Sequence, residues 1–126
     1  MRNALLIWTG VCLGLWAQRG SLLQNVPPAE RARKNPISAD TRAQKAGAKL
    51  YARECAACHG AQREGTTKAP PLKTSVISAT PPGALFWVLR NGSLRHGMPS
   101  FAHLPEIQRW QIITYVLANA DSAANR

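Results

Sequence analysis

Large aromatic side chains are scarce in this sequence of 126 residues, because Phe, Trp and Tyr together make up only 6% of it. A chain of this length has room for one compact domain and little more. With so few aromatic rings, some other apolar group is a candidate to fill part of a small core. Strand patterns are also missing, since no stretch alternates convincingly between apolar and polar residues. The sequence therefore predicts a small all-α domain.

Charge is missing from a long stretch near the N-terminus. Residues 3–18 carry none, and the basic Arg2 precedes them. This is the pattern of a signal peptide, and it is somewhat short for a free-standing membrane span. Ala17 suits the last position before a cleavage site, but Leu15 stands where a small residue is preferred. Residues 1–20 are predicted to be a signal peptide or an uncleaved N-terminal anchor, and export is expected in either case.

Acidic residues are few. Six Asp and Glu stand against 16 Lys and Arg, which gives a net charge of +10 and a pI near 10.6. The net charge is +4 over residues 1–35 and +6 over the remainder. The part expected to fold is basic in its own right, which favours acidic protein surfaces or anionic membranes as partners. Nucleic acid is not expected as a partner, because an exported chain rarely meets it.

The segment that follows the leader has the composition of a linker. Residues 21–39 are rich in proline and in basic residues and show no apolar period. The basic cluster RARK at residues 31–34 is interpreted as a solvated tether, with an anionic-lipid contact as the alternative. A helix is predicted from Asp40, capped by Ser38 or Asp40. Gly47 inside this helix costs about 1 kcal/mol relative to Ala, so we expect another element to approach it closely.

A long loop and a short helix are predicted next. Residues 60–80 are rich in Gly, Thr and Pro and read as loop. Thr80 is placed to cap the short helix, with Pro81 in its first position. Asn91 and Gly92 are expected to end it.

The last helix is predicted to run from Pro105 to about Asn119. This completes a predicted domain over residues 40–119, and residues 120–126 form a C-terminal tail. The positions at helical spacing that we expect to face the core are Ile107, Trp110, Thr114 and Leu117.

Only three cysteines are present, and two of them belong to the motif CAACH at residues 55–59. Cys12 lies in the uncharged segment and lacks the small residue expected directly before a lipidated cysteine. A zinc site would need a second pair of ligands, and His96 and His103 are not spaced as one. A thiol redox pair would stand at a helix N-terminus after a strand, and this pair stands at the end of a helix.

The remaining interpretation of CAACH is covalent haem attachment. Each thiol adds to one vinyl group, and the adjacent histidine reaches the iron, so every residue of the motif is used. Cys55 and Cys58 are the predicted thioether residues, and His59 is the predicted iron ligand. The opposite ligand is predicted to be Met98, in a loop bounded by Gly and Pro, because a thioether is a soft iron ligand. His96 and His103 are its rivals.

With these residues in place, the chain resembles a class I cytochrome c of bacterial type with a single haem. The resemblance covers residues 40–119. In that family a glycine four residues before an aromatic on the first helix lets an aromatic of the last helix cross closely, and Gly47, Tyr51 and Tyr115 match. The resemblance implies a cytochrome c fold, in which three main helices and long loops wrap around one covalently bound haem c and its iron.

The resemblance also assigns residues around the iron. A proline in a P-x-L segment lends its carbonyl to the axial histidine in that family, and Pro70 and Leu72 match it. The methionine loop of the family, G-M-P, stands unaltered around Met98. No motif fixes the partners of the haem propionates, for which the candidates are Trp87, Arg90 and Arg95.

The function implied is that of an exported electron carrier rather than an enzyme, because His and Met ligands leave the iron no open site. One alternative is a membrane-anchored haem subunit of a larger dehydrogenase or oxidase. Another is a haem ligand-binding sensor or peroxidase-like protein whose methionine leaves readily.

The expected location is the periplasm or the outer face of the bacterial inner membrane, with membrane association through the N-terminus. Electron donor and acceptor proteins with acidic docking surfaces are expected as partners. A ring of basic residues near the haem attachment would steer them, although an ordinary solvated face explains the same residues equally well: Arg53, Arg63, Lys68 and Lys73.

Overall fold

The computed structural model describes residues 22–118, so the predicted leader and C-terminal tail lie outside the described residues. Over this range the chain forms helices and loops and no named strand, which confirms the all-α prediction. None of the described helices is long and apolar enough to cross a membrane. The elements are η1 Leu22–Asn25, α1 Pro28–Arg31, α2 Thr41–Glu54, α3 Ala56–His59, α4 Ser75–Ser78, α5 Pro82–Asn91, η2 Leu94–His96 and α6 Glu106–Ala118.

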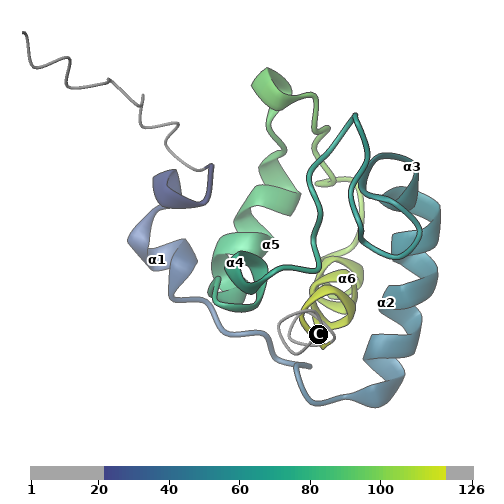
Figure 1. Cartoon of the computed structure of the whole chain (residues 1–126). Helices are drawn as coiled ribbons and strands as arrows, with labels where there is room; N and C mark the ends of the chain where they lie inside the picture. Colours follow the sequence, from purple (N-terminus) through teal and green to yellow (C-terminus); the bar gives the residue numbers. More distant parts are fainter. Residues whose placement is uncertain (1–21, 119–126) are drawn as a thin grey trace, which may run out of the picture.

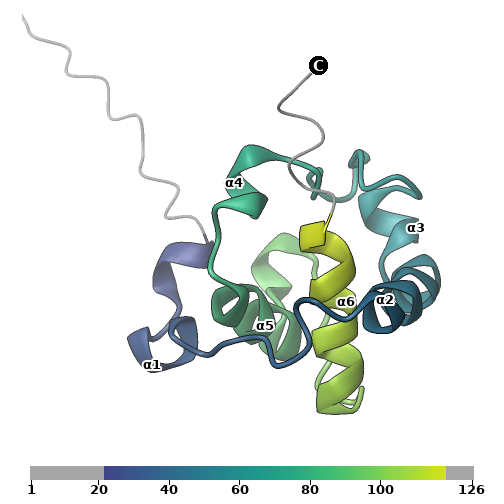
Figure 2. The same cartoon turned by 90° about the horizontal axis from the view of Figure 1, so that it is seen from below.

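The last helix is the centre of the fold. Figure 1 shows α6 between α2 on one side and α5 on the other, and Figure 2 shows the same order from below. Its buried positions surround much of the helix: Arg109, Trp110, Ile112, Ile113, Thr114 and Val116. The predicted stripe was right for Trp110 and Thr114 and wrong for Ile107, which is 48% exposed. A helix covered on two sides buries more than one apolar stripe.

Asp40 caps α2. Its carboxylate accepts hydrogen bonds from the backbone N–H groups of Arg42 at 2.8 Å and Ala43 at 3.2 Å. These groups have no partner inside the helix, so the acidic cap satisfies them. Of the two predicted caps, Asp40 is the one that the structure uses.

Gly47 is where α2 and α6 cross. A Cβ atom built on Gly47 would lie 1.9 Å from the backbone oxygen of Gln111 and 2.9 Å from Cβ of Tyr115. The close approach expected at Gly47 is therefore present, and the Gln111 backbone comes nearer than the tyrosine. The Tyr51 ring lies beside that of Tyr115, with centroids 5.3 Å apart.

The short helix α5 begins one residue later than predicted. Pro81 precedes its first residue, and no side chain caps it. The Thr80 hydroxyl donates instead to the carbonyl of Val76, at 2.6 Å, so the predicted Thr80 cap is wrong. The reason is α4, a single turn inside the segment that was predicted to be loop, whose end offers Thr80 a free carbonyl.

The residues predicted to form a solvated linker are packed on the helices. Both η1 and α1 contact α5, and Figures 1 and 2 show them on the side of α5 that is away from α2. Within RARK, Arg31 donates to the carbonyl of Leu23, and Arg33 lies over the Phe86 ring, 4.5 Å from its centroid. The tether interpretation is wrong for these two side chains, because they have partners within the fold that sequence spacing does not reveal.

The crossing at Gly47 gives a stability prediction. Gly47→Ala should lower the free energy of unfolding of the haem-bound protein by roughly 1–3 kcal/mol, because the added methyl group forces α2 away from the Gln111 backbone. This loss should outweigh the gain of about 1 kcal/mol in helix propensity. Guanidinium unfolding would measure it, with Ala52→Ser at an exposed position of α2 as the control. A Gly47→Ala protein more stable than the parent would contradict the tight crossing.

Candidate functional site

A cavity of about 440 Å³ opens between α2, α5, α6 and the loops that join them. Its wall is mostly apolar, with Leu85, Val88 and Leu89 from α5 and Ile112, Ile113 and Val116 from α6. The predicted site residues that line it are Cys55, Cys58, His59, Pro70 and Met98. The fold thus brings the CAACH motif and the methionine loop, which are about 40 residues apart, to one cavity.

The two cysteines lie at and within a single helical turn, α3. Cys55 follows α2 and is buried, whereas Cys58 lies in α3 and is exposed, and both thiols are free. Burial, with smaller contributions from Glu54 and Cys58, raises the pKa of the Cys55 thiol to about 12. A thiol with that pKa is protonated at neutral pH and is a poor nucleophile, so Cys55 is not the low-pKa thiol of a redox motif.

The ring of His59 is oriented by a backbone carbonyl. Its Nδ1 lies 2.8 Å from the carbonyl oxygen of Pro70. A carbonyl can only accept a hydrogen bond, so Nδ1 must carry the proton and Nε2 must offer its lone pair. The loop is folded back to make this contact: Gly65 adopts a φ of 81° and its N–H donates to the His59 carbonyl at 2.8 Å. This arrangement presents Nε2 as a metal ligand.

Met98 is held in place by a two-way backbone pairing. The Ser93 N–H donates to the Met98 carbonyl at 2.8 Å, and the Met98 N–H donates to the Ser93 carbonyl at 3.0 Å. Gly97, with a φ of 76°, makes the turn between them. His96 also lines the cavity, but its Nδ1 lies 2.7 Å from the Ser93 hydroxyl and its side chain is exposed. His103 is exposed and does not line the cavity.

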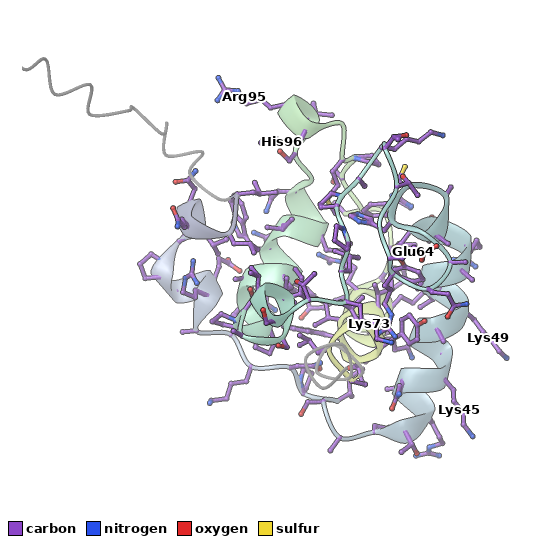
Figure 3. The ribbon with its side chains drawn as sticks, in the orientation of Figure 1. Lys45, Lys49, Glu64, Lys73, Arg95 and His96 are labelled. Carbon is purple, nitrogen blue, oxygen red and sulfur yellow. The ribbon has the colours of Figure 1, made fainter. Side chains whose placement is uncertain are left out.

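The three candidates for the propionates are not part of the cavity wall. Trp87 packs with Ala84 and Val88 on the side of α5 that meets η1. Arg90 lies 3.6 Å from a carboxylate oxygen of Glu30. Arg95 is exposed and points away from the rest of the molecule in Figure 3. The geometry therefore gives no support to a propionate role for Trp87, Arg90 or Arg95.

Arg63 does not belong to an exposed basic ring. Only 6% of the residue is exposed. Its guanidinium donates to the carbonyls of Tyr115 at 3.1 Å and Val116 at 3.3 Å, and it lies over the Tyr115 ring, 4.5 Å from the centroid. These contacts join the loop after CAACH to the C-terminal end of α6, where carbonyls lack partners inside the helix. The docking role expected of Arg63 is therefore wrong.

The other members of the predicted basic ring differ from one another. Arg53 is exposed and pairs with Glu54 at 2.6 Å. Lys68 is exposed and lines the cavity, and Lys73 is half-buried. Leu22 and Leu23 also line the cavity and were not predicted, since nothing in a proline-rich segment marks two leucines as part of a distant wall.

A haem would fit the residues that are present. The cavity lies in the usual range for cofactor sites, about 300–1,000 Å³. Its apolar wall matches a macrocycle, and two thiols stand beside an imidazole whose free nitrogen is fixed by Pro70. Thioether and imidazole donors suit iron in such a group.

Comparison with known proteins decides the family. A family model described as cytochrome c oxidase, cbb3-type, subunit III, matches residues 42–116, which is more than half of the chain. The chain belongs to this family. It is a class I c-type cytochrome with one covalently bound haem c.

A solved structure supports the same conclusion. Cytochrome CL from the marine methylotrophic bacterium Methylophaga aminisulfidivorans MPT shares 27% sequence identity with this chain. Its crystal structure superposes on this one with a TM-score of 0.57. The match covers 68% of this chain and 58% of cytochrome CL, so this chain spans little more than half the length of cytochrome CL. A search of curated proteins gave no match. Cytochromes of this class work with redox partner proteins and typically outside the cytoplasm.

The motif gives a prediction on attachment. If Cys55 and Cys58 both carry thioether bonds, haem should remain on the denatured cytochrome through acid–acetone extraction. Cys58→Ser should lower the yield of protein with covalent haem, because one of the two bonds cannot form. Cys12→Ser is the matched control and should leave the yield unchanged. Haem that extracts freely from the unmutated cytochrome would rule out thioether attachment.

Proposed function

We propose that the cytochrome is a single-electron carrier whose haem iron is held between His59 and Met98. The observation that carries this proposal is the hydrogen bond from His59 Nδ1 to the Pro70 carbonyl, which leaves Nε2 free in a cavity that Met98 also lines. If His59 and Met98 both bind the iron, no coordination position would be left for a substrate, which supports a carrier rather than an enzyme.

Each residue of the motif then has one task. Cys55 and Cys58 hold the group covalently, and His59 supplies the nitrogen ligand with its orientation fixed by Pro70. Haem c supplies one-electron exchange between Fe(III) and Fe(II) when bound. Met98 supplies a thioether ligand, which favours Fe(II) and raises the reduction potential.

Other residues of the cavity keep water away from the haem site and determine where electrons enter. Apolar side chains from α5 and α6 exclude water. The buried Tyr51 hydroxyl donates to the Gly60 carbonyl at 2.7 Å, which joins α2 to the turn after the motif. Of the two cysteines that would hold the group, Cys55 is buried and Cys58 is exposed, so the edge held by Cys58 would be the one nearer to solvent. We place electron exchange at this edge.

A basic surface beside that edge supports an acidic partner. Lys68 is exposed at the cavity wall, and Lys73 follows it in the same loop. Neither lysine has a carboxylate within ion-pair distance among the described residues. Positive charge of this kind accelerates the approach of an acidic donor or acceptor. The leader would place the cytochrome in the periplasm or on the outer face of the inner membrane.

A second candidate function is a haem subunit of a larger complex. The description of the family names an oxidase subunit, which favours this candidate. Copurification of partner subunits with the full chain from membranes would support it.

The ligand assignment gives a prediction on Met98. The oxidised cytochrome should show the weak far-red band of sulfur-to-iron charge transfer, and Met98→Ala should abolish it and lower the reduction potential, because the thioether is lost. His96→Ala is the matched control from the same loop and should keep both properties. If the band survived in Met98→Ala, another residue would be the ligand.

The basic surface gives a prediction on partner choice. Electron transfer with an acidic redox protein should slow steeply as salt rises, because mobile ions screen charges beyond about 8 Å at physiological ionic strength. Lys68→Glu with Lys73→Glu should slow the second-order rate several-fold at low salt. Lys34→Glu, at an exposed position that does not line the cavity, should change it less. A rate that does not respond to salt would speak against steering and for a pre-formed complex.

A further inference from the structure

The segment before the family-matched region forms part of the haem cavity. The family match begins at residue 42, yet Leu22 and Leu23 of η1 line the cavity. We name residues 22–37 the N-terminal strap. Leu22, Leu23 and Met98 also pack against one apolar cluster, so the strap reaches the methionine side of the cavity.

Steric contacts fix the strap on α5. Val26 is only 5% exposed and packs with Ala84 and Val88. At Gly83 the strap backbone comes so close that an added Cβ atom would lie 2.2 Å from the Glu30 carbonyl oxygen and 2.7 Å from that of Arg33. Only glycine admits the strap at this point, which shows that α5 is shaped to receive it.

A second set of contacts fixes the strap on α6. The Arg33 guanidinium lies 2.8 Å from Glu106, at the start of α6, and 5.7 Å from the centroid of the Trp110 ring in the same helix. Asn35 donates to the Thr114 hydroxyl at 2.9 Å. The strap is thus attached at both ends, and η1 lies at the end beside the cavity.

We infer that Leu22 and Leu23 limit how readily small molecules reach the iron on the Met98 side. This inference rests on the proposed Met98 ligation. An external ligand such as imidazole can bind only after the methionine leaves, and the methionine can leave only if its packing loosens. Because Leu22 and Leu23 pack on the same cluster as Met98, the strap raises the free energy of that local opening. The strap therefore favours the carrier over the ligand-binding sensor.

Apolar contacts, rather than ion pairs, hold the strap against the Met98 side of the cavity. The ion pairs of the strap are all partly exposed, so each contributes little: Glu30 with Arg33 and with Arg90, both at 3.6 Å, and Arg33 with Glu106 at 2.8 Å. The two leucines and Val26 bury apolar surface, which salt does not screen. Ligand binding controlled by the strap should consequently be insensitive to ionic strength.

The test measures imidazole association with the oxidised, haem-bound, full-length chain. Replacing both leucines, as Leu22→Ala with Leu23→Ala, should accelerate association about tenfold and lower the reduction potential, because the opening becomes easier and water gains access. The matched control is Gln24→Ala with Asn25→Ala, two exposed positions of the same turn, and it should change neither quantity. Gly83→Ala, which displaces the strap without altering the leucines, should also accelerate association.

Unchanged association rates in the leucine variant, or equal acceleration in the control, would overturn the inference. The far-red sulfur-to-iron band separates this failure from failure of the ligand assignment. If the unmutated cytochrome shows the band and the leucine variant binds imidazole no faster, Met98 is the ligand and the strap does not control access. If the band is absent but the leucine variant binds faster, the strap controls access and the Met98 assignment fails.

Discussion

Filling the central cavity is the constraint on which the rest of the structure depends. Without the haem, the apolar side chains that line the cavity of about 440 Å³ lack packing partners and face water, which destabilises the fold. The margin for such a loss is small, because a domain of this size is stable by only about 5–15 kcal/mol. Haem c therefore serves as core as well as redox group in this cytochrome. The scarcity of aromatic side chains agrees with this, because the group supplies the apolar volume that they do not.

The helices hold the shape of this cavity. Gly47 lets α2 and α6 touch backbone to backbone, which fixes one wall, and Arg63 ties the loop after the haem motif to the end of α6. Pro70 and Ser93 then set the positions of His59 and Met98 through backbone hydrogen bonds. Main-chain contacts thus fix the positions of His59 and Met98, and these two side chains need little conformational freedom to bind the iron.

Features encoded by local spacing could be predicted from the sequence, and features made by distant contacts could not. The haem motif CAACH, the helix cap at Asp40 and the close helix crossing at Gly47 can each be predicted from a few neighbouring residues. Arg63 looked like one more solvated charge, because its partners lie on α6, more than 50 residues away. Leu22 and Leu23 stand in a proline-rich stretch that reads as linker, and their role appears only when α5 is folded beside them.

Thermal unfolding of a haem-free chain tests the central role of the cavity most directly. A variant with Cys55→Ser and Cys58→Ser, freed of any residual haem, would be followed by far- and near-ultraviolet circular dichroism beside the haem-bound cytochrome. The account predicts that the haem-free chain loses its near-ultraviolet signal and its cooperative transition, because the apolar side chains around the cavity then have no packing partner. A haem-free chain that unfolds cooperatively at the midpoint of the haem-bound protein would contradict it.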